Sequence, residues 1–360
     1  MNKPGLREDN VDGVLAGAAQ APGWALCIGA GTSLPVFPDW NQLVRRLFSR
    51  VSAQPRAERL AVQLGQAFSA DALIQAAYAR SEGDAEAFAA IISEELYRDF
   101  LGAFTPDERR LVVRALSAVR PGDLSAAHWS RFLELLRERW DGRMSCLAIA
   151  ARVSETLGTP RSPAAILSFN AEPLLLAVIN AEQATRATLD DSPSDGGVPQ
   201  RVDRVVRGIS NRSTDRVPYV FCHGLLPVPG VEISQHAASP DKLVFSESAY
   251  LQMAANVYSW QATSFLDTCA ARRVVFVGLS LTDANMRRWL SWVHDSRLQE
   301  LEQIGRPQTV STQHYWLNLD PGDPEPRAWI EASVAHLGVR LVWLSTWDAI
   351  GPVLGRMLGP

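Results

Sequence analysis

The first candidate site is a glycine pair followed by two hydroxyl residues, in the stretch WALCIGAGTSLP. Gly29 and Gly31 would let the backbone turn tightly and let a ligand approach main-chain N–H groups without meeting a Cβ atom. A loop of this kind between a strand and a helix favours a pyrophosphate. A plain strand-to-helix turn explains the stretch equally well, because Leu34 stands where the dinucleotide-binding fingerprint has its third glycine.

Further polar residues follow three other apolar runs. Asn170 follows one in SFNAEPLLL, and His223 follows another in FCHGLLP. The segment VGLSLTDANMRRWL offers Gly278, Ser280, Asp283 and Asn285. Each has an ordinary structural explanation when taken alone, since an asparagine or aspartate before a helix is commonly a turn or a cap, and a histidine after a strand is commonly structural.

The elements that would position these residues alternate between strands and helices. The stretch around the first glycines begins a strand, and the pattern predicts six more strands, at 164–170, 217–224, 242–246, 272–280, 313–320 and 339–345. They are short, apolar and rich in β-branched residues, and helical patterns lie between many of them. This alternation predicts a doubly wound, mostly parallel, Rossmann-like α/β sheet. Ligands of such sheets bind beyond the carboxyl ends of the strands, where Gly31, Asn170, His223 and Ser280 would meet.

The domain organisation is indicated by one long stretch of the sequence in which only helical patterns occur. We expect one Rossmann-like domain from residues 1–55 and 160–360, interrupted by a large helical insertion at 56–159 whose amphipathic helices pack on the sheet as a lid. Residues 185–216 lack apolar periodicity and contain DDSPSDGG, which predicts a long flexible loop, with a lid or partner-binding segment as the alternative.

The composition excludes several classes of protein. A net charge of −4 gives no basic excess for nucleic acid, so nucleic acid is expected as an indirect partner only. The four cysteines form no C-x-x-C pair, so neither a structural zinc site nor a disulfide framework is expected. The N-terminus is polar, and no run reaches the roughly 18 apolar residues of a membrane helix, so we expect a cytoplasmic protein without a membrane partner.

Taken in order, the motifs resemble the sirtuin-like NAD-binding domain, in particular its prokaryotic branch found in anti-phage defence. That branch shows G-A-G-x-S with a following P-x-W, then N-Y-D-x-L-L-E, H-G, SE-x-x-Y and G-x-S-x-x-D-x-N segments. This chain reads GAGTSLPVFPDW, SFNAEPLLL, FCHGLLP, VFSESAY and VGLSLTDANMRRWL, so the resemblance covers about residues 24–290. Ala171 replaces the usual aromatic residue, and Glu172 replaces the aspartate, which keeps the charge on a longer arm.

The resemblance implies that NAD is the substrate. No metal is expected, because the chain lacks C-x-x-C pairs. In the family, an asparagine and a histidine matching Asn170 and His223 serve cleavage of the bond between nicotinamide and ribose. A carboxamide can hold a ribose hydroxyl or a water, and a histidine with a pKa of about 6.5 can accept a proton near neutral pH. We expect these two as catalytic residues, and as the NAD-binding set Gly29, Ala30, Gly31, Thr32, Ser33, Asp39, Gly278, Ser280, Asp283 and Asn285.

The expected function is therefore NAD hydrolysis to nicotinamide and ADP-ribose by an abortive-infection effector that stays inactive until a partner triggers it. Expected partners are further copies of the chain and a HerA-type ATPase or another defence subunit. NAD-dependent deacylation is less expected, because deacylases of this fold carry two C-x-x-C pairs and a PDFR segment where this chain has FPDWN. The alternative from another class is a regulatory or scaffolding subunit that binds NAD or ADP-ribose without turnover, against which the pairing of Asn170 with His223 argues.

Overall fold

The fold is built on one parallel sheet. The computed structural model describes residues 4–16, 23–52, 54–81, 84–189, 198–208, 213–230, 243–256, 259–308 and 311–359. Within these residues, eight parallel strands lie in the order β1-β8-β7-β6-β2-β3-β5-β4. Their bounds are β1 (Leu6–Arg7), β2 (Trp24–Ile28), β3 (Ala165–Ser168), β4 (Val202–Val205), β5 (Val217–Phe221), β6 (Arg273–Val277), β7 (His314–Leu319) and β8 (Val339–Leu344).

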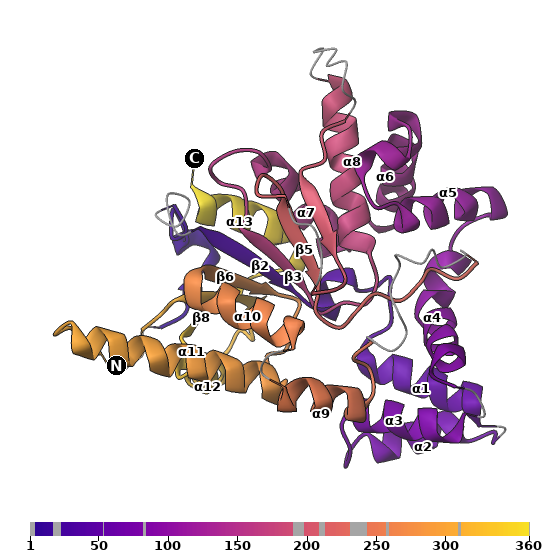
Figure 1. The fold of residues 1–360 in the computed structure, drawn as a ribbon, viewed down its shortest axis with the longest axis horizontal. Coiled ribbons are helices and arrows are strands. Elements are labelled where there is room, and N and C mark those ends of the chain that lie inside the picture. Colours follow the sequence, from indigo (N-terminus) through magenta and orange to yellow (C-terminus); the bar gives the residue numbers. More distant parts are fainter. Residues whose placement is uncertain are drawn as a thin grey trace.

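Both faces of the sheet are covered by helices, which explains why the central strands are apolar throughout (Figure 1). Every residue of β2 is buried. Leu26 and Ile28 pack towards α7 (Ser145–Thr156), α8 (Leu174–Leu189) and α13 (Ile350–Leu358). Ala25 and Cys27 pack on the opposite face, towards α10 (Trp260–Ala271), α11 (Ala284–Gln303) and α12 (Pro324–Ala335). The prediction of a doubly wound, Rossmann-like α/β fold is confirmed.

The long segment between β2 and β3 is helical, as predicted. Its helices are α1 (Trp40–Val51), α2 (Ala57–Leu64), α3 (Ala70–Arg80), α4 (Ala85–Gly102), α5 (Pro106–Ser117), α6 (Ala126–Trp140) and α7. Side chains of Asp39, Asp84, Thr105 and Ser125 cap four of them. Their buried hydrophobic residues belong to the same hydrophobic cluster as Leu26, so the helices share a core with one face of the sheet. That residues 56–159 form a separable module stays a prediction.

One predicted strand is wrong, and two short strands were missed. Of 242–246, the described residues 243–246 lie outside any strand, and α9 (Glu247–Ala255) follows them directly. The preceding strand, β5, is already paired on both sides, with β3 and β4, and the main-chain bond from Val244 N–H to the His223 carbonyl continues no ladder. The missed strands, β1 and β4, have two and four residues, too few for a period to show.

The predicted loop at 185–216 is partly regular structure. Helix α8 continues to Leu189, and β4 pairs with β5 inside the segment. Val202 and Val205 are buried, but the two charged residues between them hide the strand pattern. Residues 190–197 and 209–212 of the predicted loop lie outside the described residues. None of the described helices has the length and apolar character to cross a membrane.

Candidate active site

The predicted site residues follow neighbouring strands in the middle of the sheet. Strand β2 lies between β3 and β6, and the chain builds β3, β5 and β4 on one side of it before β6, β7 and β8 on the other. The order of strands therefore reverses at β2, and crevices for ligands form at the carboxyl ends of strands at such a point. Asn170 and His223 follow β3 and β5, whereas Gly278 follows β6.

The glycines hold two strand-end loops against each other. Gly31 N–H donates to the Gly278 carbonyl at 2.9 Å, and a Cβ on Gly31 would lie 2.9 Å from the Gly278 Cα. Gly278 has a φ of +66°, and a Cβ there would overlap the main-chain nitrogen of Thr32. Gly29 N–H and Thr32 N–H also donate to main-chain carbonyls, at 3.0 Å each. Three N–H groups of the loop thus donate hydrogen bonds within the protein. The glycines therefore allow the two loops to pack closely, and these N–H groups are not free to bind a phosphate.

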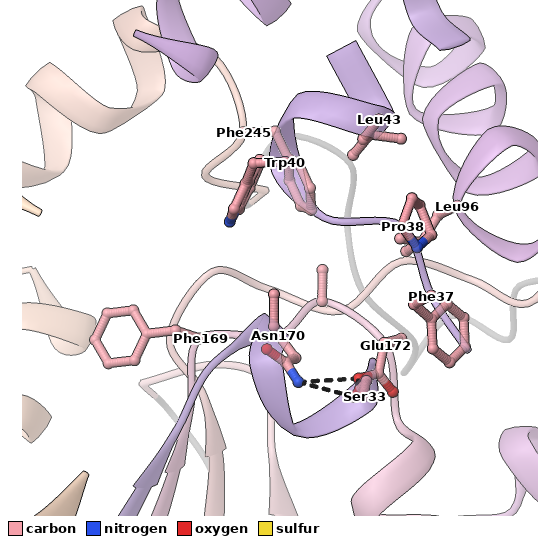
Figure 2. A pocket seen from close by; sticks show the side chains of 12 residues that line it. Ser33, Phe37, Pro38, Trp40, Leu43, Leu96, Phe169, Asn170, Glu172 and Phe245 are labelled. Atoms are coloured by element: carbon pink, nitrogen blue, oxygen red, sulfur yellow. Dashed lines mark hydrogen bonds between the residues drawn. The ribbon is translucent and has the colours of Figure 1, made fainter. Parts of the chain in front are cut away.

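The hydroxyls of the same loop bind Asn170. Its Nδ2 lies 3.3 Å from Thr32 Oγ1, 3.2 Å from Ser33 Oγ and 3.0 Å from Glu172 Oε1. Thr32 Oγ1 donates to the Gly29 carbonyl at 2.8 Å, and Ser33 Oγ donates to Glu172 Oε1 at 2.5 Å. Figure 2 shows Ser33, Asn170 and Glu172 together at the polar side of a pocket. Two loops far apart in the sequence are joined by this network.

Glu172, which the sequence showed as a replacement for the family's aspartate without a role assigned to it, is part of the site. Its side chain is buried, and burial raises its pKa to about 7, although hydrogen bonds from Ser33, the Leu174 main chain and Asn170 act in the opposite direction. The Leu174 N–H donates to Glu172 Oε2 at 2.5 Å, so the carboxyl also holds the first turn of α8. The available signal was an acidic residue between apolar residues at a helix start, in NAEPLLL.

A pocket of about 40 Å³ opens above this network. Ala30, Ser33, Asn170 and Glu172 line it on the strand-end side. Its other lining residues are apolar and come largely from the segments around α1 and α4: Phe37, Pro38, Trp40, Leu43, Leu96, Phe169, Ala171 and Phe245 (Figure 2). The buried Oδ1 of Asn170 has no hydrogen-bond partner among the described residues. The pocket therefore combines an apolar wall with one unpaired acceptor.

His223 lies beside the pocket and is enclosed by aromatic rings. Its ring centroid is 5.0 Å from that of Phe169, 5.9 Å from Tyr250 and 6.3 Å from Trp40, all edge-on. Neither ring nitrogen has a hydrogen-bond partner among the described residues. Burial lowers its pKa to about 4, and the nearby Phe169 backbone opposes only part of this effect. The imidazole is therefore neutral near pH 7 and keeps one nitrogen free to accept a proton.

The remaining predicted residues lie outside this pocket. Asp39 caps α1 through Gln42 N–H at 2.7 Å, and Asp283 caps α11 through the N–H groups of Asn285 and Met286 at 2.8 Å. Ser280 is exposed and pairs with Thr282 at 2.7 Å. Asn285 is buried in the first turn of α11. The structure thus brings Ala30, Thr32, Ser33 and Asn170 together next to His223, and gives the two aspartates a capping role.

Comparison with protein families gives a match for one segment of the chain. A model of the SIR2-like domain matches residues 201–337, which run from β4 through α12 and include His223 and Gly278. This stretch of the chain is therefore similar to a SIR2-like domain. SIR2-like domains in general use NAD, so the match indicates an NAD-related function. The glycine loop and Asn170 precede the matched residues, and the sheet brings them to the SIR2-like segment.

Among curated proteins, none matches this sequence. Within the described part of the chain, no three or more His, Cys, Asp or Glu side chains are grouped so that they could hold a metal ion. The four cysteines are buried and unpaired as disulfides.

Proposed function

We propose that this protein hydrolyses NAD to nicotinamide and ADP-ribose in the pocket above Asn170. The observation that carries the proposal is the unpaired, buried Oδ1 of Asn170 in a pocket at the carboxyl edge of the sheet, with a neutral histidine beside it. This combination offers an acceptor for a hydroxyl and a base for a proton, which is what cleavage at the ribose carbon requires.

The reaction breaks the bond between ribose C1′ and the pyridine nitrogen, and nicotinamide leaves as a neutral molecule with the bonding electron pair. A water oxygen bonds to C1′, and the proton that it loses goes to His223 and then to solvent. Asn170 Oδ1 accepts a hydrogen bond from a ribose hydroxyl or from that water, which fixes the direction of attack. The aromatic wall keeps other water molecules away from the transition state, in which the ribose carries positive charge.

The nicotinamide end of NAD fits the lining better than the phosphates do. Trp40, Phe169 and Phe245 offer flat apolar surfaces that suit a cationic pyridine ring. The N–H groups of Gly29, Gly31 and Thr32 are bonded within the protein, so pyrophosphate binding by the loop would depend on its other groups or on a rearrangement. The NAD-binding roles of Asp39, Gly278, Ser280, Asp283 and Asn285 remain proposals from the family resemblance.

Regulation of the activity is proposed from the family resemblance. An enzyme that consumed NAD without restraint would harm its own cell, so a defence effector of this kind is expected to stay inactive until a partner switches it on. Assembly of several copies, or binding of a HerA-type ATPase or another defence subunit, is the proposed trigger. High turnover by an isolated monomer, identified by light scattering, would contradict this part of the proposal.

The test of the reaction is product analysis in water enriched in oxygen-18. Hydrolysis predicts equal amounts of nicotinamide and ADP-ribose, with the label in the ADP-ribose. A cyclic product, or ADP-ribose bonded to another group, would mean that a nucleophile other than water attacks C1′. Binding of NAD in a titration without any product, even after candidate partners are added, would favour a binding subunit.

A further inference from the structure

We propose that Glu172 is a positioning residue: its carboxylate, together with Ser33, holds the Asn170 amide so that the nitrogen faces the protein and the oxygen faces the pocket. The inference rests on the proposed function, because it assigns the orientation of the amide that the reaction uses. The three residues come from the β2–α1 segment and the β3–α8 segment, and Figure 2 shows them meeting at the polar side of the pocket.

The orientation of the Asn170 amide follows from where the hydroxyl protons of Ser33 and Thr32 are donated. The Ser33 hydroxyl gives its proton to Glu172 Oε1, and the Thr32 hydroxyl gives its proton to the Gly29 carbonyl. Both hydroxyl oxygens therefore offer only lone pairs to Asn170, and an ionised Glu172 offers only lone pairs as well. All three oxygen neighbours of Nδ2 are acceptors. A reversed amide would place Oδ1 against three acceptors and lose every one of these hydrogen bonds.

Glu172 is the member of the network that can change this arrangement. As a carboxylate it accepts from Ser33, Asn170 and the Leu174 N–H, whose helix start also favours a negative charge. A protonated carboxyl would bring a donor into the network, and the amide would no longer be restricted to one orientation.

The groups around Glu172 allow both its ionised and its protonated form near neutral pH. The titratable groups that act on Glu172 are Tyr97 from α4, Cys146 from α7 and Tyr219 from β5, and burial raises the pKa of each. All three are neutral at pH 7 and place no positive charge beside the carboxylate. His223 is neutral as well. The Glu172 pKa of about 7 fits this uncompensated burial.

The first test is Glu172→Gln, which keeps the size of the side chain and removes the charge. We expect kcat for NAD cleavage to fall about 100-fold while KM changes little, because the reacting groups are misaligned although the pocket is kept. Wild-type kcat should rise with pH around 7, and the variant should lack this rise. Glu172→Asp, which keeps the charge, should retain more activity than Glu172→Gln.

The matched control is Glu182→Gln, which alters a second buried glutamate, this one within α8, that pairs with Arg137 at 2.7 Å outside the pocket. It should leave kcat and its pH profile unchanged. Equal losses in both variants would reduce Glu172 to a structural role and overturn the proposal. Where Glu172→Gln fails to fold, Ser33→Ala removes one acceptor of the network and should lower kcat in the same way.

A second readout does not depend on catalysis. In protein labelled with ¹⁵N-asparagine, the Asn170 side-chain amide signals, assigned by their loss in Asn170→Ala, should shift with pH around 7 in the wild type. They should not shift in Glu172→Gln. Signals that are identical in both proteins and constant with pH would overturn the positioning role. A titrating signal in a protein that cleaves no NAD would instead contradict the proposed function alone.

Discussion

At the scale of single residues, the site consists of one oriented amide and one desolvated imidazole. Asn170 and His223 follow different strands, and the ring of Phe169 touches His223 while Asn170 is its chain neighbour. The sequence indicated both residues, because each stands directly after an apolar run, within motifs whose order resembles one family. It could not indicate that Glu172 joins Asn170 to the glycine loop, since this depends on the spacing between two strands and not on local pattern.

The aromatic enclosure of His223 leads to the first prediction. Trp40→Ala should raise the pKa of His223 from about 4 towards its ordinary value of 6.5, because the indole is part of what keeps water from the ring. A pH titration of the histidine signals by NMR measures this. Trp329→Ala is the control, since that indole is 69% exposed on α12 and should leave His223 unchanged. An unchanged pKa in Trp40→Ala would show that other residues alone desolvate the ring.

At the scale of elements, the contact between the β2 and β6 loops determines the site geometry. Gly31 and Gly278 approach so closely that neither has room for a Cβ. The sequence interpretation assigned these glycines to phosphate binding, because glycine composition alone does not distinguish an approaching ligand from an approaching loop.

Gly278→Ala tests this contact. Because the residue has a positive φ and its Cβ would overlap Thr32, the variant should lose more stability than the cost of about 1 kcal/mol for the backbone conformation alone, and it should lose activity. Gly142→Ala is a matched control, with a φ of +68° and open space around the Cβ. Urea unfolding compares the two. Equal losses of stability would mean that the loop contact adds nothing.

The limits of sequence-based prediction also appear at this scale. Buried strands such as β2 and β6 are continuous apolar runs and were located correctly. Strand β4 was missed because Asp203 and Arg204 interrupt it, and 243–246 was misassigned because Val244 and Phe245 are buried without being paired. Apolar character reports burial, whereas strand pairing depends on which neighbours have a free edge.

At the scale of the whole molecule, buried histidines couple stability to pH. Burial lowers the pKa of His314 to about 3 and that of His223 to about 4, both from 6.5. As the pH falls below 6.5, the unfolded chain takes up protons that the folded protein cannot, so both histidines lower stability in acid. Glu172 acts in the opposite direction between pH 4.5 and 7, because its raised pKa makes the folded form bind the proton.

Because the two histidines together outweigh the glutamate, we predict a lower free energy of unfolding at pH 4.5 than at pH 6.5. His314→Asn, which can keep an acceptor for the Val274 N–H, should reduce this difference by on the order of 2 to 3 kcal/mol. Urea unfolding of wild type and variant at the two pH values provides the measurement. The same pH dependence in both proteins would show that His314 is not the source.

The most direct test of the central claim is NAD consumption by the purified protein, alone and with candidate partners, beside Asn170→Ala and His223→Ala. We predict that the wild type releases nicotinamide and ADP-ribose and that both substitutions abolish this while the proteins remain folded. Undiminished cleavage by either folded variant, or no cleavage by the wild type under any of these conditions, would contradict the assignment of the pocket as an NAD hydrolase site.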